Sequence, residues 1–212
     1  MTETALPPYI GFQTDFEIAG RTSTANQKTR VGLVSGGYFA TVGVPLLRGR
    51  LFDDSDVQLA RHYAVINDEM ARTYFSNGID PIGQRIHVRA LEFNNPDFFT
   101  PPAGDQWFEI AGVVATARNR GLSDKPEPAI YIPYTMVMVP WSSYLIHTAG
   151  DPHLLINTIR QRVRMVDADQ PVMEIRTLEE VLHDFERAYP LQHDIVQHLR
   201  GRRFAACGYR NV

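Results

Sequence analysis

The fold class is decided by the stretch SYLIHTAGDPHLLINTIRQRVRMVDADQPVMEIR, residues 143–176. Its first six residues predict a strand, and Asp151 followed by Pro152 predicts a helix start, since aspartate caps helices and proline suits the first helical position. The helix carries one apolar stripe, made by Leu155, Ile159, Val163 and Val166. A second strand follows over 171–176. Strand, helix and strand at this spacing predict a right-handed βαβ unit whose two strands are parallel neighbours.

The same region continues into a second helix. Thr177 and Glu180 have the spacing of a capping box, which predicts a helix running through Phe185. Three basic residues lie toward the C-terminal end of the preceding helix, where cations interact favourably with exposed carbonyls: Arg160, Arg162 and Arg164. The C-terminal part therefore reads as a compact lobe of alternating strands and helices.

Residues 31–125 have a different sequence pattern, in which short predicted strands alternate with turns that contain glycine and proline. The expected strands are residues 31–34, 63–66, 84–89 and 108–114, with further strands at 16–19 before this region and 129–132 after it. One helical turn is expected over 38–42, ended by Gly43, and one longer helix over 69–75, capped by Asn67 or Asp68. Together with the C-terminal lobe, this predicts an α+β fold in two lobes.

Composition excludes several classes of protein. The net charge is -3 with a pI near 6.2, and the arginines are scattered among acids, which argues against a nucleic-acid partner. No run of eighteen apolar residues occurs, and the first twenty residues lack the pattern of a secretory signal, so we expect the chain as written to be soluble. Cys207 is the single cysteine and cannot form an intramolecular disulfide. The P-loop pattern of ATP-hydrolysing proteins is missing from the sequence.

Two groups of residues are candidate metal sites. The acidic run 53–56 offers several oxygens for calcium, but it lacks the central glycine and the distal glutamate of a calcium loop, which favours a solvated loop or a helix cap. His147 and His153 are six residues apart, and His193 and His198 are five apart, so neither pair has the i, i+4 spacing of a zinc site on one helical face. We therefore predict no metal-ligating residue.

Two further features are candidate catalytic nucleophiles. Ser35-Gly36-Gly37 does not meet the G-x-S-x-G pattern and is better explained by glycines at a strand end. Cys207 stands beside Gly208, and no neighbouring residue in the sequence offers a base to activate its thiol. We therefore predict that the chain is not an enzyme, with no catalytic residue, no cofactor-binding residue and no cofactor.

A series of short motifs gives a more specific indication through its order and spacing. These motifs are Val34-Ser-Gly-Gly-Tyr-Phe39, Gly43-Val-Pro-Leu-Leu-Arg-Gly-Arg50 with Phe52 and Asp56, Ala64-Val-Ile-Asn67 with Ala71 and Phe75, Asp80-Pro-Ile-Gly83, Ile110-Ala-Gly-Val-Val114 and Ile130-Tyr-Ile-Pro-Tyr134. Over about residues 30–182 the sequence resembles the MacB-like periplasmic core domain of ABC transporter permeases, in the branch found in long duplicated permeases.

The resemblance implies an extracytoplasmic, non-catalytic domain held between two transmembrane helices of its permease. It implies a porter-like βαβ lobe over residues 1–30 and 127–185, with its first βα segment missing, and an inserted β-rich lobe over 31–126. In this family a cytoplasmic ATPase drives the membrane helices, and the domains of two permease copies move against each other. The implied function is therefore to transmit motion and to contact a second permease copy or an extracytoplasmic accessory protein.

The tail, residues 186–212, departs from the family. A long apolar helix is expected there, but the sequence cannot span a bilayer. Our hypothesis is that the chain is an excised or prematurely ended piece whose tail is atypical, non-native or out of frame. Because the first βα segment is missing, we expect an unpaired edge in the porter-like sheet, which another copy of the chain pairs or the tail covers.

Other interpretations remain open. The apolar run 136–141, with Met138 and Trp141, is either core or a contact patch. The main alternative function is a small-molecule or peptide-binding module with an aromatic-lined cleft between the two lobes. An unrecognised hydrolase would instead require a nucleophile, a base and an orienting group within reach of one another.

Overall fold

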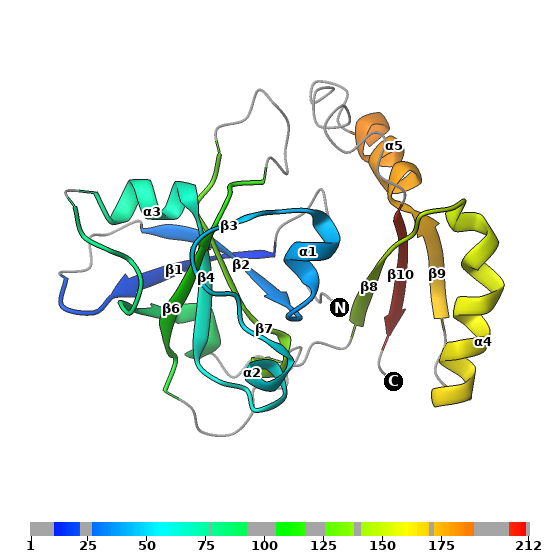
Figure 1. Cartoon of the computed structure of the whole chain (residues 1–212), viewed down its shortest axis with the longest axis horizontal. Helices are drawn as coiled ribbons and strands as arrows, with labels where there is room; N and C mark the ends of the chain where they lie inside the picture. The colour runs from blue at the N-terminus through cyan, green and yellow to red at the C-terminus, as the bar shows by residue number, and fades with distance from the viewer. Residues whose placement is uncertain are drawn as a thin grey trace.

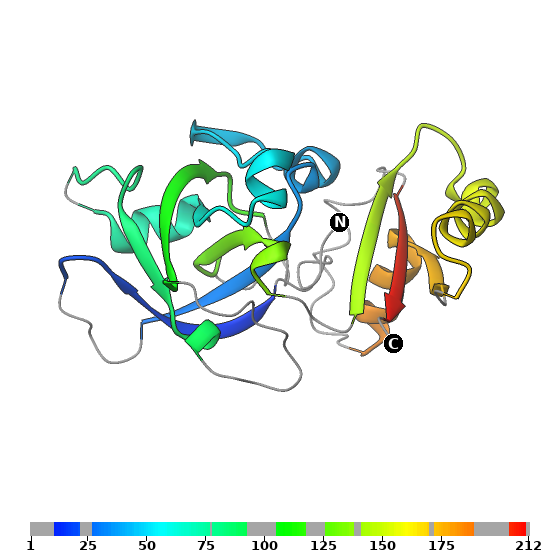
Figure 2. The ribbon, with the colours of Figure 1, turned by 90° about the horizontal axis from the view of Figure 1, so that it is seen from below.

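Two separate β-sheets organise the chain, as Figures 1 and 2 show. The protein is seen here in a computed structural model that describes residues 11–21, 27–76, 78–92, 105–117, 126–137, 141–169, 172–188 and 204–210. A seven-stranded sheet forms the larger lobe and a three-stranded sheet with helices forms the smaller one. The α+β class predicted from the sequence is confirmed.

Six strands of the larger lobe close into a barrel. The strands of this lobe are β1 (Phe12–Ile18), β2 (Lys28–Val34), β3 (Leu46–Gly49), β4 (Tyr63–Asn67), β5 (Arg85–Val88), β6 (Trp107–Val114) and β7 (Ala129–Pro133). Their order is β3-β6-β4-β7-β2-β1-β5, and β5 also pairs with β6. Glu109 of β6 lies opposite Tyr63 of β4 and Arg85 of β5, so these two strands flank β6 on opposite edges. Further along β6, the short strand β3 takes over the edge that β5 leaves.

Alternation along the strands separates an inner core from an outer one. Ile130 and Ile132 of β7 belong to a buried cluster to which all six barrel strands contribute, whereas Ala129 and Tyr131 belong to a second cluster. Because successive side chains of a strand point to opposite faces, the first cluster fills the barrel and the second covers its outside. Each fully buried large apolar side chain contributes about 1.5–3 kcal/mol, so the filled interior makes the barrel a rigid unit.

Two short helices cover the outer cluster: α1 (Tyr38–Val42) and α2 (Asp54–Gln58). Phe39 packs edge-to-face on Tyr131, with ring centroids 5.0 Å apart. Gly43 ends α1 with a φ of 71°, a left-handed conformation that glycine adopts without steric cost. The predicted helical turn over 38–42 is confirmed.

The third helix of this lobe is α3 (Asp68–Tyr74), which supplies Met70 and Ala71 to the barrel core. Asn67, not Asp68, is its N-cap. Short 3-10 turns follow β5 and β7: η1 (Arg89–Glu92) and η2 (Tyr134–Met136).

The smaller lobe contains β8 (Trp141–His147), η3 (Pro152–Leu155), α4 (Ile156–Val166), β9 (Val172–Thr177), α5 (Leu178–Ala188) and β10 (Phe204–Arg210). The strand, helix, strand and helix predicted over 143–185 are therefore present. The prediction that the two strands are neighbours is wrong, because β10 lies between β8 and β9 and is antiparallel to both. β8 and β9 do run parallel, but they are one strand apart. A strand supplied by a distant segment leaves no mark on the local pattern from which neighbours were inferred.

Strand pairing also sets lobe boundaries that differ from those expected. The sequence-based division placed residues 1–30 and 127–185 in the porter-like lobe, yet β1 and β7 are hydrogen-bonded within the barrel. The expected atypical tail, 186–212, supplies β10 to the middle of the smaller sheet and not a cover for an unpaired edge. We propose boundaries at residues 11–137 for the barrel lobe and 141–210 for the smaller lobe.

Candidate functional site

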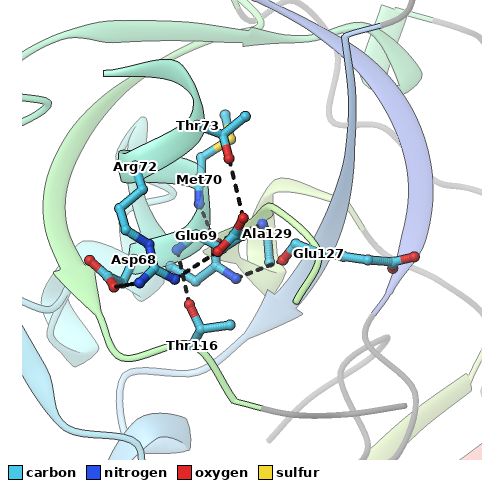
Figure 3. Close-up of polar contacts among 9 residues, drawn as sticks. Asp68, Glu69, Met70, Arg72, Thr73, Thr116, Glu127 and Ala129 are labelled. Atoms are coloured by element: carbon cyan, nitrogen blue, oxygen red, sulfur yellow. Dashed lines mark hydrogen bonds and ion pairs between the residues drawn. The ribbon is translucent and has the colours of Figure 1, made fainter. Parts of the chain in front are cut away.

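A buried asparagine joins three elements of the barrel lobe. Asn67 Oδ1 accepts hydrogen bonds from the Met70 amide at 2.9 Å and the Ala129 amide at 3.0 Å, and its Nδ2 donates to the Glu127 carbonyl at 2.8 Å. The residue ends β4 with extended backbone angles, as an N-cap requires, and is 1% exposed. Figure 3 shows these contacts at the start of α3. One side chain therefore satisfies backbone groups from α3 and from the start of β7.

The first turn of α3 makes a second contact of this kind. The Glu69 amide donates to Thr116 Oγ1 at 2.9 Å, just beyond the end of β6. On the outer side of the helix, Arg72 pairs with Glu69 at 2.7 Å and with Asp68 at 3.4 Å (Figure 3). The start of α3 thus holds the start of β7 and the segment just after β6. We call this set of contacts the Asn67 junction.

A buried carboxylate forms a second polar cluster, in the acidic run 53–56. Asp53 caps α2 by accepting from the Asp56 amide at 2.8 Å, and Asp56 accepts from the Asp53 amide at 3.1 Å. Asp56 is 2% exposed and also pairs with Arg50 at 2.6 Å and Arg61 at 3.4 Å. The helix-cap interpretation is confirmed, but Asp56 itself is buried rather than solvated.

These contacts set the charge state of Asp56. Burial alone would raise its pKa, but hydrogen bonds from Arg50 and the Asp53 amide, with the charges of Arg50 and Arg61, lower the pKa below its ordinary value. The carboxylate stays ionised near neutral pH and ties α2 to the segments on either side of it. Because two guanidinium groups already occupy its oxygens, the arrangement disfavours calcium there.

The connection between the two lobes is packed where the structure describes it. After β7, Tyr134 touches both the inner and the outer cluster, and Val137 is buried in the inner one. Thr135 donates a hydrogen bond to the Val57 carbonyl of α2. In the smaller lobe, Leu145 of β8 packs on the outer cluster, where α1 faces β8 (Figure 1). The lobes therefore share an apolar contact beside their covalent connection.

The smaller lobe also holds an open polar groove of about 660 Å³ among η3, α4, β9 and α5. Arg160 lines one side and Glu179 another, while Arg176 pairs with Glu174 and Asp184 within the groove. The groove lies inside one lobe, not between the two. Among the described residues that line it there is no phenylalanine, tyrosine or tryptophan, unlike the pocket expected of a binding module.

The two described histidine candidates lie on different elements. His147 ends β8 and His153 lies in η3, while His193 and His198 fall outside the described residues. Gly37 precedes α1 as a turn residue. Among the residues that the structure describes, no group of three or more histidine, cysteine, aspartate or glutamate side chains is placed to hold a metal ion.

The apolar run 136–141 is core at its start. Met136 is 8% exposed and Val137 is 1% exposed, so both belong to the barrel. Residues 138–140, with Met138, lie outside the described residues, and Trp141 begins β8. The choice between core and contact patch is therefore decided for the first two residues only.

Sequence reasoning offered Asn67 or Asp68 as the cap of α3 but missed that Asn67 also binds the start of β7. The signal available was an asparagine directly after an apolar strand, which identifies a cap and says nothing about a second partner sixty residues away. It likewise missed that Asp56 is buried between two arginines.

Taken together, these features define an α+β domain whose polar clusters hold its elements in place. The family model described as the MacB-like periplasmic core domain matches residues 5–173. The chain belongs to this family, which confirms the resemblance seen in its motifs, and it is thus a periplasmic domain of the type found in MacB-like ABC transporter permeases.

A named relative agrees with this assignment. The chain is 30% identical over 148 residues to the macrolide export ATP-binding/permease protein MacB 1/2 of Paracoccus denitrificans (strain Pd 1222), covering 70% of this chain and 19% of that protein. It therefore spans about a fifth of that relative's length.

Two solved structures similar to the chain are also periplasmic or permease domains by name. The periplasmic region of MacB from Actinobacillus actinomycetemcomitans gives a TM-score of 0.47 at 14% identity, covering 74% of this chain and 64% of that one. A domain of a putative permease from Porphyromonas gingivalis gives 0.42 at 12% identity, with coverages of 94% and 70%. Among the described residues, no helix has both the length and the apolar character needed to cross a membrane.

Proposed function

We propose that this domain is a non-catalytic relay of an ABC transporter permease. It moves with the membrane helices of its parent protein, which a cytoplasmic ATPase drives, and contacts a second permease copy or a periplasmic accessory protein. The family assignment supports the setting, and the packed connection between the lobes carries the proposal, because a relay must pass displacement from one lobe to the other without a loose hinge.

The physical argument rests on how each part resists deformation. The barrel has no open gap between β5 and β6, and its interior is filled. Leu145 and Tyr134 add apolar contacts at the junction of the lobes. Bending there would expose apolar surface, at a free-energy cost of about 25 cal/mol for each Å² exposed. A displacement of the smaller lobe therefore carries the barrel with it.

Catalysis finds less support. Within the polar groove, Asp184 is engaged in an ion pair with Arg176, and Glu180 accepts from the Thr177 amide at 2.8 Å as part of the α5 cap. A hydrolase requires a nucleophile, a base and an orienting group within reach, and the described lining of this groove offers no serine or cysteine nucleophile.

Distance measurements in the parent permease test the relay. Leu47→Cys on the exposed strand β3 and Gly150→Cys in the smaller lobe accept spin labels, since Leu47 is half exposed and a Cβ at Gly150 meets nothing within 4 Å. Cys207→Ser removes the native thiol. We expect the Leu47–Gly150 distance within one copy to stay constant between ADP-bound and ATP-bound states, while the Leu47–Leu47 distance between copies changes.

A matched variant sharpens this test. Leu145→Ser removes the apolar contact between β8 and the outer cluster, whereas Ser143→Ala lies two residues along the same strand and leaves that contact in place. Leu145→Ser should broaden the distance distribution within one copy, and Ser143→Ala should leave it unchanged. A large nucleotide-dependent change within one copy of the unmodified domain would rule out a rigid relay.

A further inference from the structure

Large apolar side chains are exposed on the rod formed by η3 and α4. The three most exposed large apolar side chains all lie on the η3–α4 rod: Leu154 is 78% exposed, Met165 76% and Val166 90%. Leu154 and Met165 are eleven residues apart, about three helical turns, so they fall on the same side of the rod. Leu155, Ile159 and Val163 face the sheet instead and are half-buried. In Figures 1 and 2, α4 lies on the side of the smaller sheet away from the barrel.

Arginines flank these two apolar side chains on both sides of the rod. Arg160 lines the polar groove, Arg164 lies one turn further along the same side of the helix, and Arg162 lies on the opposite side by its helical angle. All three are exposed, and within the part of the chain that the structure describes none of their side chains has an ion pair or hydrogen bond. The sequence of α4 holds three arginines and no acidic residue, so its exposed face is basic between Asp151 and Asp167, the carboxylates that cap the two ends of the rod.

An acidic surface lies across the groove on the same lobe. Glu179 and Glu180 are in the first turn of α5, and Asp184 is one turn further on. Glu179 is exposed and, among the described residues, is engaged in no ion pair. The lobe therefore carries a basic apolar wall and an acidic wall side by side. A surface of this kind is self-complementary, because a two-fold axis brings the basic wall of one copy onto the acidic wall of the other.

We propose that two copies of this chain dock through their smaller lobes, with α4 of each copy against α5 of the other. Leu154 and Met165 lose solvent contact at the centre of this interface, and Arg160 and Arg164 face Glu179 of the partner copy. Exposed apolar residues surrounded by complementary charge are typical of transient protein interfaces. This inference rests on the proposed function only for the identity of the partner, a second permease copy.

Charge exchange tests the interface on the full chain by sedimentation velocity, over a concentration series up to about 1 mM. Each surface pair contributes modestly, but a two-fold axis counts every substitution twice, so we expect Arg160→Glu to weaken the dimer at least about tenfold. Glu179→Arg should weaken it similarly. The double variant with both changes should recover most of the dimer, because each copy again offers opposite charges.

Two controls distinguish a specific contact at α4 from a general effect of net charge. Arg72→Glu alters an exposed arginine of α3 in the barrel lobe and should leave the dimer constant unchanged. Raising the salt concentration should weaken the unmodified dimer. A chain that stays monomeric at every concentration overturns the proposal, as does one that dimerises equally well with Arg160→Glu.

Vesicles containing phosphatidylglycerol test the other possible occupant of a basic apolar face. A monomeric chain that cosediments with them through α4 would show that this surface meets lipid, which also overturns the proposal. Neither result bears on the distance measurements in the permease: ATP-driven movement of a domain that is monomeric in solution would leave the relay standing and remove only this interface.

Discussion

The Asn67 junction makes the most quantitative prediction. Asn67→Ala removes the cap of α3 and leaves the Met70 and Ala129 amides without their side-chain acceptor. Loss of an N-cap costs about 1 kcal/mol, and an unpaired buried amide costs about 1–3 kcal/mol. Ala129 is 1% exposed, so water cannot replace the lost acceptor there. The Glu127 carbonyl lies on an exposed residue and can be hydrated, so it adds little.

These contributions predict a loss of about 2–4 kcal/mol in the free energy of unfolding of the barrel lobe. Since small proteins are stable by about 5–15 kcal/mol, the barrel should remain folded at 25 °C with a clearly lowered urea midpoint. Circular dichroism in urea measures this loss. Amide exchange locates it, because the Met70 and Ala129 amides should lose protection first.

Thr116→Val is the matched control. It removes one acceptor, for the half-buried Glu69 amide, in the same junction, and should cost about 1 kcal/mol or less without exposing Ala129. If Asn67→Ala costs less than about 0.5 kcal/mol, or if both amides keep their protection, then Asn67 is not the group that joins α3 to β7.

Three further predictions concern the charge, the close packing and the strand order of the protein. The pKa of Asp56 is lower in the folded state than its ordinary value of 3.8, so its stabilising contribution is present above pH 4 and is lost as the pH falls through the folded pKa. Asp56→Asn should therefore destabilise the barrel by about 1–3 kcal/mol at pH 7 in urea titrations and flatten the acid limb of its stability profile; an unchanged acid limb would contradict this. Gly112→Ala should lower stability by about 1–3 kcal/mol, because the added Cβ would lie 2.2 Å from a backbone carbonyl oxygen, and a thermal melt like that of the unmodified chain would count against it. Tyr144→Cys should form an intramolecular disulfide with Cys207 on mild oxidation, since the two are paired in the antiparallel ladder of β8 and β10; Ser143→Cys should not, and peptide mapping that found the reverse would disprove the register.

Local elements could be predicted from the sequence because their causes are local. The cap at Asp151 with Pro152, the capping box at Thr177 and the glycine stop at Gly43 each act within one turn of helix, and all three helices or turns are present. The family could be recognised from the sequence because its motifs are glycine turns and apolar strands at set spacings. These signals do not depend on what the rest of the chain does.

Long-range pairing could not be predicted in the same way. The barrel closes because β5 pairs with both β1 and β6. The alternation of apolar and polar residues along a strand does not indicate which other strands it pairs with. The placement of β10 between β8 and β9 could not be predicted for the same reason, since a short apolar segment could pair with many different strands. The burial of Asp56 follows from two arginines on opposite sides of α2, which a reading of the acidic run alone treats as solvent-facing.

The two proposals are linked by the path between the surfaces they invoke. Contact at α4 would act on the smaller sheet, on its side away from the barrel, and that sheet reaches the barrel through Leu145 and the buried connection at Val137. Beyond that contact, the outer cluster lies against β7, whose first residue is held by Asn67 at the start of α3. Each of these steps is apolar packing or a buried hydrogen bond, so a displacement at one end is carried to the other. Leu145→Ser should therefore uncouple the barrel from the smaller lobe without weakening the dimer, whereas Arg160→Glu should weaken the dimer and leave the lobes coupled. If one substitution produced both effects, the docking surface and the relay could not be separate parts of the domain.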